Sequence, residues 1–266
     1  MTAVIVLSVI LAVLLCILPS PKKTASQPPE TTIPEATYPM PEANTLLPED
    51  FTYINGYLTC LTEESMLGID VSSHQKEIDW EQVKAAGVEF VMIRAGYRGL
   101  DLGGLYADEY AQINYQGAKK AGLQIGAYFF SQATTPAEAL EEAEFALEIT
   151  KDWVMEFPLV FDWEHSGEEN RVAYMTAPQI TECTKVFCEA VQASGRTPMV
   201  YFNLQQARSL LLLELLTDYP FWLAMYTDDF IYEYKVDMWQ YTCEGTVPGI
   251  EGNVDINLYF PPKPLA

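Results

Sequence analysis

Short apolar runs alternate with segments of helical length along most of the chain. Eight runs have the length and apolar content of β-strands, at residues 68–71, 90–95, 123–130, 159–162, 198–201, 221–224, 236–240 and 254–256. Segments that read as helices follow the first five runs, at residues 80–86, 106–121, 135–150, 177–194 and 204–216. Strand–helix repetition of this kind predicts a parallel α/β barrel. We therefore expect a TIM-like (β/α) barrel with eight strands and fewer helices in its C-terminal third.

Glycines mark the ends of predicted helices and bear on an alternative fold. Gly122 and Gly195 directly follow two helical segments, at the position where glycine commonly ends a helix. An open doubly wound sheet that binds a dinucleotide would carry a GxGxxG sequence after an early strand, and the sequence has none. The cluster of Gly99, Gly103 and Gly104 has a different spacing and is interpreted as a loop.

The first twenty residues are predicted to lie outside the fold. Residues 3–18 are almost entirely apolar, a length that fits a marginal membrane span or a signal-peptide core. Leu15 is too bulky to precede a lipoprotein cleavage site at Cys16, so an uncleaved membrane anchor is favoured. Lys22 and Lys23 follow the run, which under the positive-inside rule favours a cytoplasmic C-terminal side. Because large domains are exported despite such a weak bias, we expect an extracytoplasmic protein, membrane-anchored or secreted.

A proline-rich stretch separates this segment from the repeating part. Eight of the seventeen prolines lie between Pro19 and Pro48, together with Thr, Ser and Glu. A stretch of this composition buries too little apolar surface to fold and behaves as a semi-rigid spacer. The chain is therefore divided into an apolar anchor or signal segment (1–20), a Pro/Thr-rich linker (21–50), a lead-in segment (51–66) and a barrel (67–262).

The composition excludes several classes of function. The net charge of −22 argues against a nucleic-acid partner, because phosphate binding needs clustered Lys and Arg. Only two histidines occur in 266 residues, and neither a metal site nor a cofactor is expected. The apolar fraction of 49% is ample for a packed core and excludes global disorder.

The predicted strand near residue 160 ends in two carboxylates. Side chains alternate across a strand, so Asp162 and Glu164 point to one side and Trp163 points to the other. This spacing places the carboxylates roughly 6–7 Å apart, within the range of about 5–9.5 Å over which paired carboxyl groups flank a glycosidic bond. A solvent-facing pair of acids is the alternative, but an apolar strand rarely ends on Asp-Trp-Glu merely to reach water.

Other acids and aromatic residues lie where the remaining strands are predicted to end, which is where barrel enzymes place their active sites. The candidates are Asp70, Arg94, Tyr128, Tyr201, Trp222, Tyr226, Trp239, Gln240 and Asp255. Any single Tyr or Trp belongs to a core more often than to a site, but carboxylates at three strand ends are hard to explain by packing. Acids beside aromatic rings suit a carbohydrate site, in which sugars stack on the rings. A cation site is the second interpretation.

Short motifs keep a fixed order along the predicted barrel. They are GIDVSSHQ at 68–75, IDW at 78–80, FVMIRAGY at 90–97, GAYFFS at 126–131, FDWE at 161–164, YFN at 201–203, FWLA at 221–224, MWQY at 238–241 and GNVDIN at 252–257. The ordered set resembles family 25 of the glycoside hydrolases, the Chalaropsis-type lysozymes, whose fold is an irregular barrel with eight strands and few helices. Departures are mild: Phe129 stands where some members have His, and Phe202 where Thr is common.

The resemblance implies an N-acetylmuramidase that cleaves the β-1,4 bond between N-acetylmuramic acid and N-acetylglucosamine in bacterial peptidoglycan. It implies that Glu164 is the general acid and that Asp162 orients or charge-stabilises the 2-acetamido group of the substrate. Asp70 and Asp255 match two further acids at the mouth of the barrel. Substrate assistance and direct attack by water both stay open. The expected partners are peptidoglycan glycan strands and, through the N-terminal apolar segment, the bacterial membrane, and a monomer is expected.

Two other functions are weighed against this one. A catalytically inactive peptidoglycan-binding barrel would usually lack one of the acids, and all four are present in this sequence. A chitinase-like hydrolase would share the acetamido-assisted chemistry, but its longer Asp-rich strand motif is absent, since Asp162 follows Pro-Leu-Val-Phe.

Overall fold

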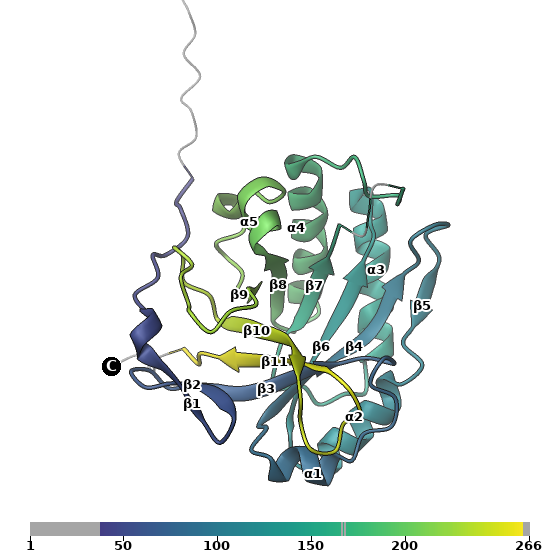
Figure 1. Cartoon of the computed structure of the whole chain (residues 1–266). Helices are drawn as coiled ribbons and strands as arrows, with labels where there is room; N and C mark the ends of the chain where they lie inside the picture. The colour runs from purple at the N-terminus through teal and green to yellow at the C-terminus, as the bar shows by residue number, and fades with distance from the viewer. Residues whose placement is uncertain (1–37, 166, 168, 263–266) are drawn as a thin grey trace, which may run out of the picture. The chain divides into compact units, whose positions relative to one another are not determined.

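Eight strands close into a barrel in the computed structural model, which describes residues 38–262 apart from 166 and 168 (Figure 1). Going round the barrel, they are β3 (Met66–Val71), β11 (Val254–Tyr259), β10 (Met238–Gly245), β9 (Phe221–Ala224), β8 (Pro198–Asn203), β7 (Leu159–Trp163), β6 (Gln124–Ser131) and β4 (Phe90–Arg98). Pairing of β3 with β4 closes the ring, and β5 (Leu105–Ala107) adds an antiparallel edge to β4. The predicted eight-stranded barrel is confirmed.

The last strand of the barrel runs against the others. Six neighbouring pairs are parallel, from β3–β4 round to β9–β10, whereas β11 is antiparallel to both β10 and β3. The prediction of a wholly parallel barrel is therefore wrong for this strand. Residues 246–253 are too few for a crossover helix, so the chain returns as a hairpin. Asp255 consequently lies near the start of its strand, paired in register with Asp70.

The helices cover only part of the barrel (Figure 1). They are α1 (Trp80–Ala85), α2 (Ala111–Lys120), α3 (Pro136–Ile149), α4 (Ala177–Ala193) and α5 (Leu204–Ser209). Two differ from prediction: α2 begins at Ala111 because residues 105–107 pair with β4, and α5 ends at Ser209 before a short 3-10 turn at Leu213–Leu215. Gly122 and Gly195 follow α2 and α4 with φ of +74° and +83°, a conformation that favours glycine.

Alternation along each strand divides the buried side chains into two layers. Val160 on β7 packs inside the barrel with Phe90, Met92 and Met199, whereas Phe161 belongs to the outer layer between the strands and the helices. The same alternation sends Asp162 inward, two residues beyond Val160. The strand therefore changes from apolar packing inside the barrel to carboxylates at its C-terminal mouth.

A hairpin of β1 (Phe51–Ile54) and β2 (Tyr57–Cys60) packs on the barrel beside β10. The Phe51 ring lies edge-on to Trp239 with centroids 5.3 Å apart, and the Leu58 amide donates to the Tyr241 hydroxyl at 3.3 Å. The hairpin thus takes the place of a covering helix over the helix-poor side of the barrel.

The segment before this hairpin also contacts the barrel. Ala43 forms a β-bridge with Tyr234, and the Lys235 amide donates to the Glu42 carbonyl at 2.8 Å. The predicted linker (21–50) therefore extends too far, because residues 42–50 lie on the folded part. The anchor or signal predicted at residues 1–20 falls outside the described residues. Within the described ranges, no helix combines the length and apolar content needed to cross a bilayer.

Candidate active site

A cavity of about 710 Å³ opens at the mouth of the barrel. Ten of the eleven predicted site residues line it: Asp70, Arg94, Tyr128, Asp162, Glu164, Tyr201, Trp222, Tyr226, Gln240 and Asp255. They come from β3, β4, β6, β7, β8, β9, β10 and β11 and from the turn after β9 and the loop after β7. The barrel therefore gathers side chains that are up to 185 residues apart in the sequence, from Asp70 to Asp255.

Trp239 is the exception, and its prediction as a substrate-binding residue is wrong. Its side chain is fully buried in the outer layer against Phe51 and Phe230, and its indole N–H donates to the Met225 carbonyl at 2.8 Å. The reason is alternation along β10: Gln240 faces the cavity, so its neighbour in the sequence must face away from it.

Asp70 lies buried at the end of β3 and is held by two side-chain amides. Gln240 Nε2 and Asn257 Nδ2 each donate to Asp70 Oδ2 at 2.8 Å. Burial raises the pKa of this carboxyl well above its usual value, and the nearby negative charge of Asp255 raises it further. The two amide donors act in the opposite direction because they favour the charged form.

The same amides are oriented by aromatic residues of the cavity. Gln240 Oε1 accepts hydrogen bonds from the Tyr201 hydroxyl at 3.0 Å and the Tyr226 hydroxyl at 3.1 Å. Asn257 Oδ1 accepts from the Trp222 indole N–H at 2.8 Å. Each amide therefore has its oxygen occupied by donors, which directs its nitrogen at Asp70.

The acid pair on β7 lies in a strongly acidic environment. Asp162 is 5% exposed, and its pKa is raised well above the usual value, mainly by burial and then by the charges of Glu164 and Asp70. Burial also raises the pKa of Glu164, with a further increase from Asp255. Burial raises the pKa of Asp255 to about 6. Because these carboxyls repel one another, the cluster retains protons at a pH where isolated carboxyls are ionised.

Arg94 places a positive charge close to this cluster. Its Nε and Nη2 atoms donate to Asp108 Oδ2 at 2.8 Å, and Nη2 also reaches the Ser73 hydroxyl at 3.1 Å. Its positive charge lowers the pKa of both Asp162 and Tyr128, against the larger effect of burial. Asp108 therefore fixes the guanidinium at the edge of the cavity, a role that the sequence pattern did not indicate.

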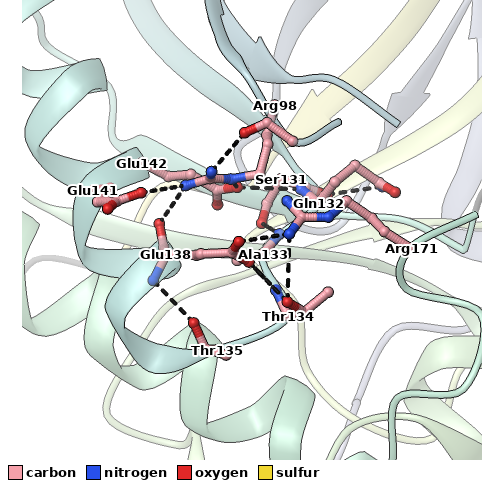
Figure 2. Close-up of polar contacts among 11 residues, drawn as sticks. Arg98, Ser131, Gln132, Ala133, Thr134, Thr135, Glu138, Glu141, Glu142 and Arg171 are labelled. Atoms are coloured by element: carbon pink, nitrogen blue, oxygen red, sulfur yellow. Dashed lines mark hydrogen bonds and ion pairs between the residues drawn. The ribbon is translucent and has the colours of Figure 1, made fainter. Parts of the chain in front are cut away.

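The backbone of Glu164 is held from the neighbouring strand. Gln132, which follows β6, donates through Nε2 to the Glu164 carbonyl at 2.9 Å. Figure 2 shows the buried ion pair behind Gln132, in which Arg98 Nε donates to Glu142 Oε1 at 2.7 Å. The same oxygen accepts a hydrogen bond from the backbone N–H of Gln132 at 3.3 Å. A side chain on α3 and one on β4 thus fix the residue that contacts Glu164.

A second glutamine holds the preceding residue from the other side. Gln206 on α5 is buried, and its Nε2 donates to the backbone carbonyl of Trp163. Its Oε1 accepts a hydrogen bond from the backbone N–H of Asn203 at 2.6 Å. The carbonyls of Trp163 and Glu164 are therefore bound by amides from the β6 and β8 sides. Neither glutamine was predicted, because no local pattern distinguishes a buried glutamine from a surface one.

Chemically, the cavity offers carboxyls that hold protons beside carboxylates, the guanidinium groups of Arg94 and Arg98, and several aromatic rings. Such a combination suits acid–base chemistry on a polyhydroxylated ligand. Across the described part of the chain, no group of three or more His, Cys, Asp or Glu side chains is arranged to hold a metal ion.

Comparison with known proteins identifies a family. The model of the glycosyl hydrolases family 25 matches residues 69–250. This match spans the barrel from β3 to the loop before β11 and includes three of the four predicted catalytic acids.

Individual relatives are distant but consistent. The chain is 29% identical over 196 residues to the autolytic lysozyme of Clostridium acetobutylicum, covering 72% of this chain and 55% of that protein. The structure of this chain resembles that of the lysozyme of Streptomyces coelicolor, with a TM-score of 0.60 and 25% identity, over 74% of this chain and 92% of that one. It also resembles the modular autolysin LytC of Streptococcus pneumoniae (TM-score 0.67, 22% identity, 79% and 52%), which was also solved with a synthetic peptidoglycan ligand. The chain thus spans about half the length of that autolysin.

Proposed function

Because the chain belongs to family 25 of the glycosyl hydrolases, we propose that it hydrolyses the β-1,4 bonds between N-acetylmuramic acid and N-acetylglucosamine in bacterial peptidoglycan. The observation that carries the proposal is the acid pair of β7, whose two carboxyls line one cavity and have raised pKa values. Named lysozymes among the relatives and the peptidoglycan complex of LytC support the choice of substrate.

Glu164 is the proposed general acid. It is partly exposed to the cavity, and burial together with the charge of Asp255 favours its protonated form. Protonation of the leaving oxygen is needed because the departing sugar alkoxide is a poor leaving group.

Asp162 is the proposed partner of the 2-acetamido group. Within the described residues, its buried Oδ1 atom has no hydrogen-bond partner, so it is available to accept from the N–H of a bound substrate. An acceptor there would turn the acetamido oxygen toward the anomeric carbon and stabilise the charge that develops. Direct attack by water is the other course, and the geometry of the two carboxyls alone does not decide between them.

Asp70 and Asp255 are the other two proposed catalytic acids. Their negative charges help to keep the pKa values of Asp162 and Glu164 raised. Arg94, Tyr128, Tyr201, Trp222, Tyr226 and Gln240 are the proposed substrate-binding residues. The rings of Tyr128, Tyr201 and Trp222 pack edge to face and offer an amphipathic wall, apolar on its face and polar at the hydroxyls.

The proposed substrate places the working protein outside the cytoplasm. We infer that residues 1–20 direct export and that the chain stays attached to the membrane or is secreted. The support is the apolar run at residues 3–18. Detergent extraction of the full chain from membranes, compared with release into the medium, tests attachment against secretion.

Analysis of the reducing ends released from purified peptidoglycan tests the activity. New N-acetylmuramic acid ends are expected. New N-acetylglucosamine ends would point instead to a different glycosidase, such as a chitinase-like enzyme. Binding to the insoluble wall without new ends would identify an inactive, peptidoglycan-binding barrel.

A further inference from the structure

A second cavity of about 570 Å³ adjoins the active site. Tyr226 lines both cavities and is 56% exposed, so its ring lies at the boundary between them. The second cavity, called here the outer cavity, is walled by the β1–β2 hairpin through Tyr53 and Tyr57 and by β10 through Tyr241. The active-site cavity therefore continues past Tyr226 onto the hairpin side of the barrel.

The hairpin that walls the outer cavity lies outside the part of the chain that matches the family, residues 69–250. It is nevertheless fixed on the barrel. Leu58 donates to the Tyr241 hydroxyl at 3.3 Å, and the Tyr57 hydroxyl lies 3.5 Å from the Thr246 carbonyl oxygen that it faces. A surface held in this way is preorganised, which lowers the entropy cost of binding a ligand.

The lining of the outer cavity favours a neutral ligand rich in hydroxyl groups. The Tyr53 ring is 50% exposed, and its hydroxyl donates to Asp228 Oδ1 at 2.6 Å. Glu244 adds a second carboxylate, and among the described lining residues there is neither Lys nor Arg. Carboxylates accept hydrogen bonds from sugar hydroxyls but repel the carboxylates of a peptide.

The wall of β10 is irregular at this point. Its register with β11 shifts between Gln240 and Thr242 and again between Thr242 and Gly245. Bulges of this kind occur beside active sites, where they redirect side chains and end strand pairing. Here the irregularity separates the catalytic part of β10, at Gln240, from the part that lines the outer cavity.

We propose that the outer cavity is a glycan subsite that binds sugars of the same strand beyond the cleavage site, with Tyr53 as its stacking platform. This proposal rests on the proposed muramidase activity and extends it: the enzyme would act faster on long strands than on short ones. The continuity through Tyr226 carries the inference, because a strand that fills the active-site cavity and leaves on that side must cross the hairpin.

The test compares kcat/KM on uncrosslinked long glycan strands with kcat/KM on a tetrasaccharide of the same repeat, both stripped of stem peptides and with their lactyl carboxyl groups converted to amides so that the sugars are neutral. In Tyr53→Ala, the long-to-short ratio is expected to fall about three- to tenfold, the loss typical of one exposed aromatic contact. Asp228→Ala should lower the ratio in the same direction. Tyr174→Ala, which removes a tyrosine that is 91% exposed and lines neither cavity, should leave it unchanged.

The outcomes separate this proposal from the activity on which it rests. If wild type releases no reducing ends from either substrate, the proposed function fails. If wild type is active but neither Tyr53→Ala nor Asp228→Ala changes the ratio, the outer subsite is ruled out. A loss seen only on strands that keep their stem peptides would assign the cavity to peptide and overturn the glycan subsite. Melting temperatures of both variants verify that each is folded.

Discussion

Asp162 on β7 and Glu164 just after it both line the active-site cavity but differ in how far they reach solvent. Asp162 is enclosed, and its charge is opposed by burial and by three neighbouring carboxyls, those of Glu164, Asp70 and Asp255, while Arg94 acts as a compensating cation. Glu164 stands one position beyond the strand and is partly exposed. This difference matches their proposed roles. Glu164, as the general acid, must reach the leaving oxygen, whereas Asp162, which orients the acetamido group, must stay fixed and shielded from water.

Glu164→Gln is expected to abolish most activity while the fold is kept. A glutamine has the same shape but cannot donate the proton, and general acid catalysis contributes about two to four orders of magnitude in rate. Release of reducing ends from peptidoglycan measures the loss. Glu144→Gln, an exposed change on α3, is the matched control. A Glu164→Gln protein that kept more than about a tenth of wild-type turnover would remove Glu164 from the role of acid.

Asp255→Asn should move the alkaline limb of the pH–rate profile to lower pH. The negative charge of Asp255 helps to raise the pKa of Glu164, so removing it lets Glu164 lose its proton at a lower pH. Activity that needs protonated Glu164 is lost as pH rises through this pKa, so the limb follows it. Profiles of kcat/KM for wild type, Asp255→Asn and the exposed control Asp152→Asn test the shift. An unchanged or alkaline-shifted limb in Asp255→Asn would contradict it.

At the residue scale, the sequence predicted most of the side chains that line the active-site cavity, but it did not predict the residues that hold them in place. Acids at strand ends are visible because such residues are unusual after apolar runs. Trp239 failed because the run Trp-Gln-Tyr at 239–241 does not say which of its members faces inward. Gln132, Gln206 and Asp108 were missed because their contacts join neighbouring strands and the segments that follow them, and only the folded chain brings those partners together.

At the scale of elements, the end of β7 is held on both sides. Gln132 binds the Glu164 carbonyl from the β6 side, and Gln206 binds the Trp163 carbonyl from the β8 side. Since β7 pairs with both of these strands, the catalytic turn is fixed by side chains where the strand pairing ends. The glutamines are therefore positioning residues that act through the backbone at Trp163 and Glu164.

Gln206→Leu should lower kcat with little change in KM. The substitution leaves the Trp163 carbonyl and the Asn203 amide without their buried partner, at a cost of about 1–3 kcal/mol in stability. The neighbouring variant Gln205→Leu changes an exposed side chain on the same helix and is the control. A purely structural role would lower the melting temperature without altering kcat of the folded protein. That result, or an equal rise in KM, would contradict a positioning role.

The order of elements was readable from the sequence, but the direction of the last strand was not. Apolar runs located all eight barrel strands, because strands buried on both faces are nearly continuous in hydrophobicity. The sense of β11 depends on how residues 246–253 turn, and the start of α2 depends on the pairing of residues 105–107 with β4. Both are tertiary outcomes that local preference does not encode.

At the scale of the whole molecule, a chain that begins at Phe51 should be less stable than one that begins at Tyr38. The shorter chain loses the backbone hydrogen bonds Asn44 N–H to Glu233 and Lys235 N–H to Glu42, each contributing about 0.5–1.5 kcal/mol. A fall of a few kelvin in melting temperature is expected. Activity should be kept, because none of residues 38–50 lines the active-site cavity. Equal melting temperatures would show that this segment adds nothing to the fold.

Buried acids should also make the stability of the whole molecule depend on pH. Burial raises the pKa of Asp255 from an ordinary value of 3.8 to about 6, and it raises those of Asp70 and Asp162 as well. Between the unfolded and folded pKa values the native state binds more protons than the unfolded chain, so stability falls as pH rises through this window.

The melting temperature is therefore expected to be higher at pH 5 than at pH 7.5. Repulsion among the charges that give the net −22 acts in the same direction, but it is screened by salt whereas the buried term is not. Measurement in 0.5 M salt therefore isolates the contribution of the buried acids.

At position 255 asparagine cannot titrate, so Asp255→Asn should show a smaller difference in melting temperature between the two pH values than wild type. The exposed control Asp152→Asn should behave as wild type. If stability in high salt instead rose from pH 5 to pH 7.5, these acids would be ionised in the folded state at little cost. The proton-holding cluster proposed for catalysis would then lose its physical basis.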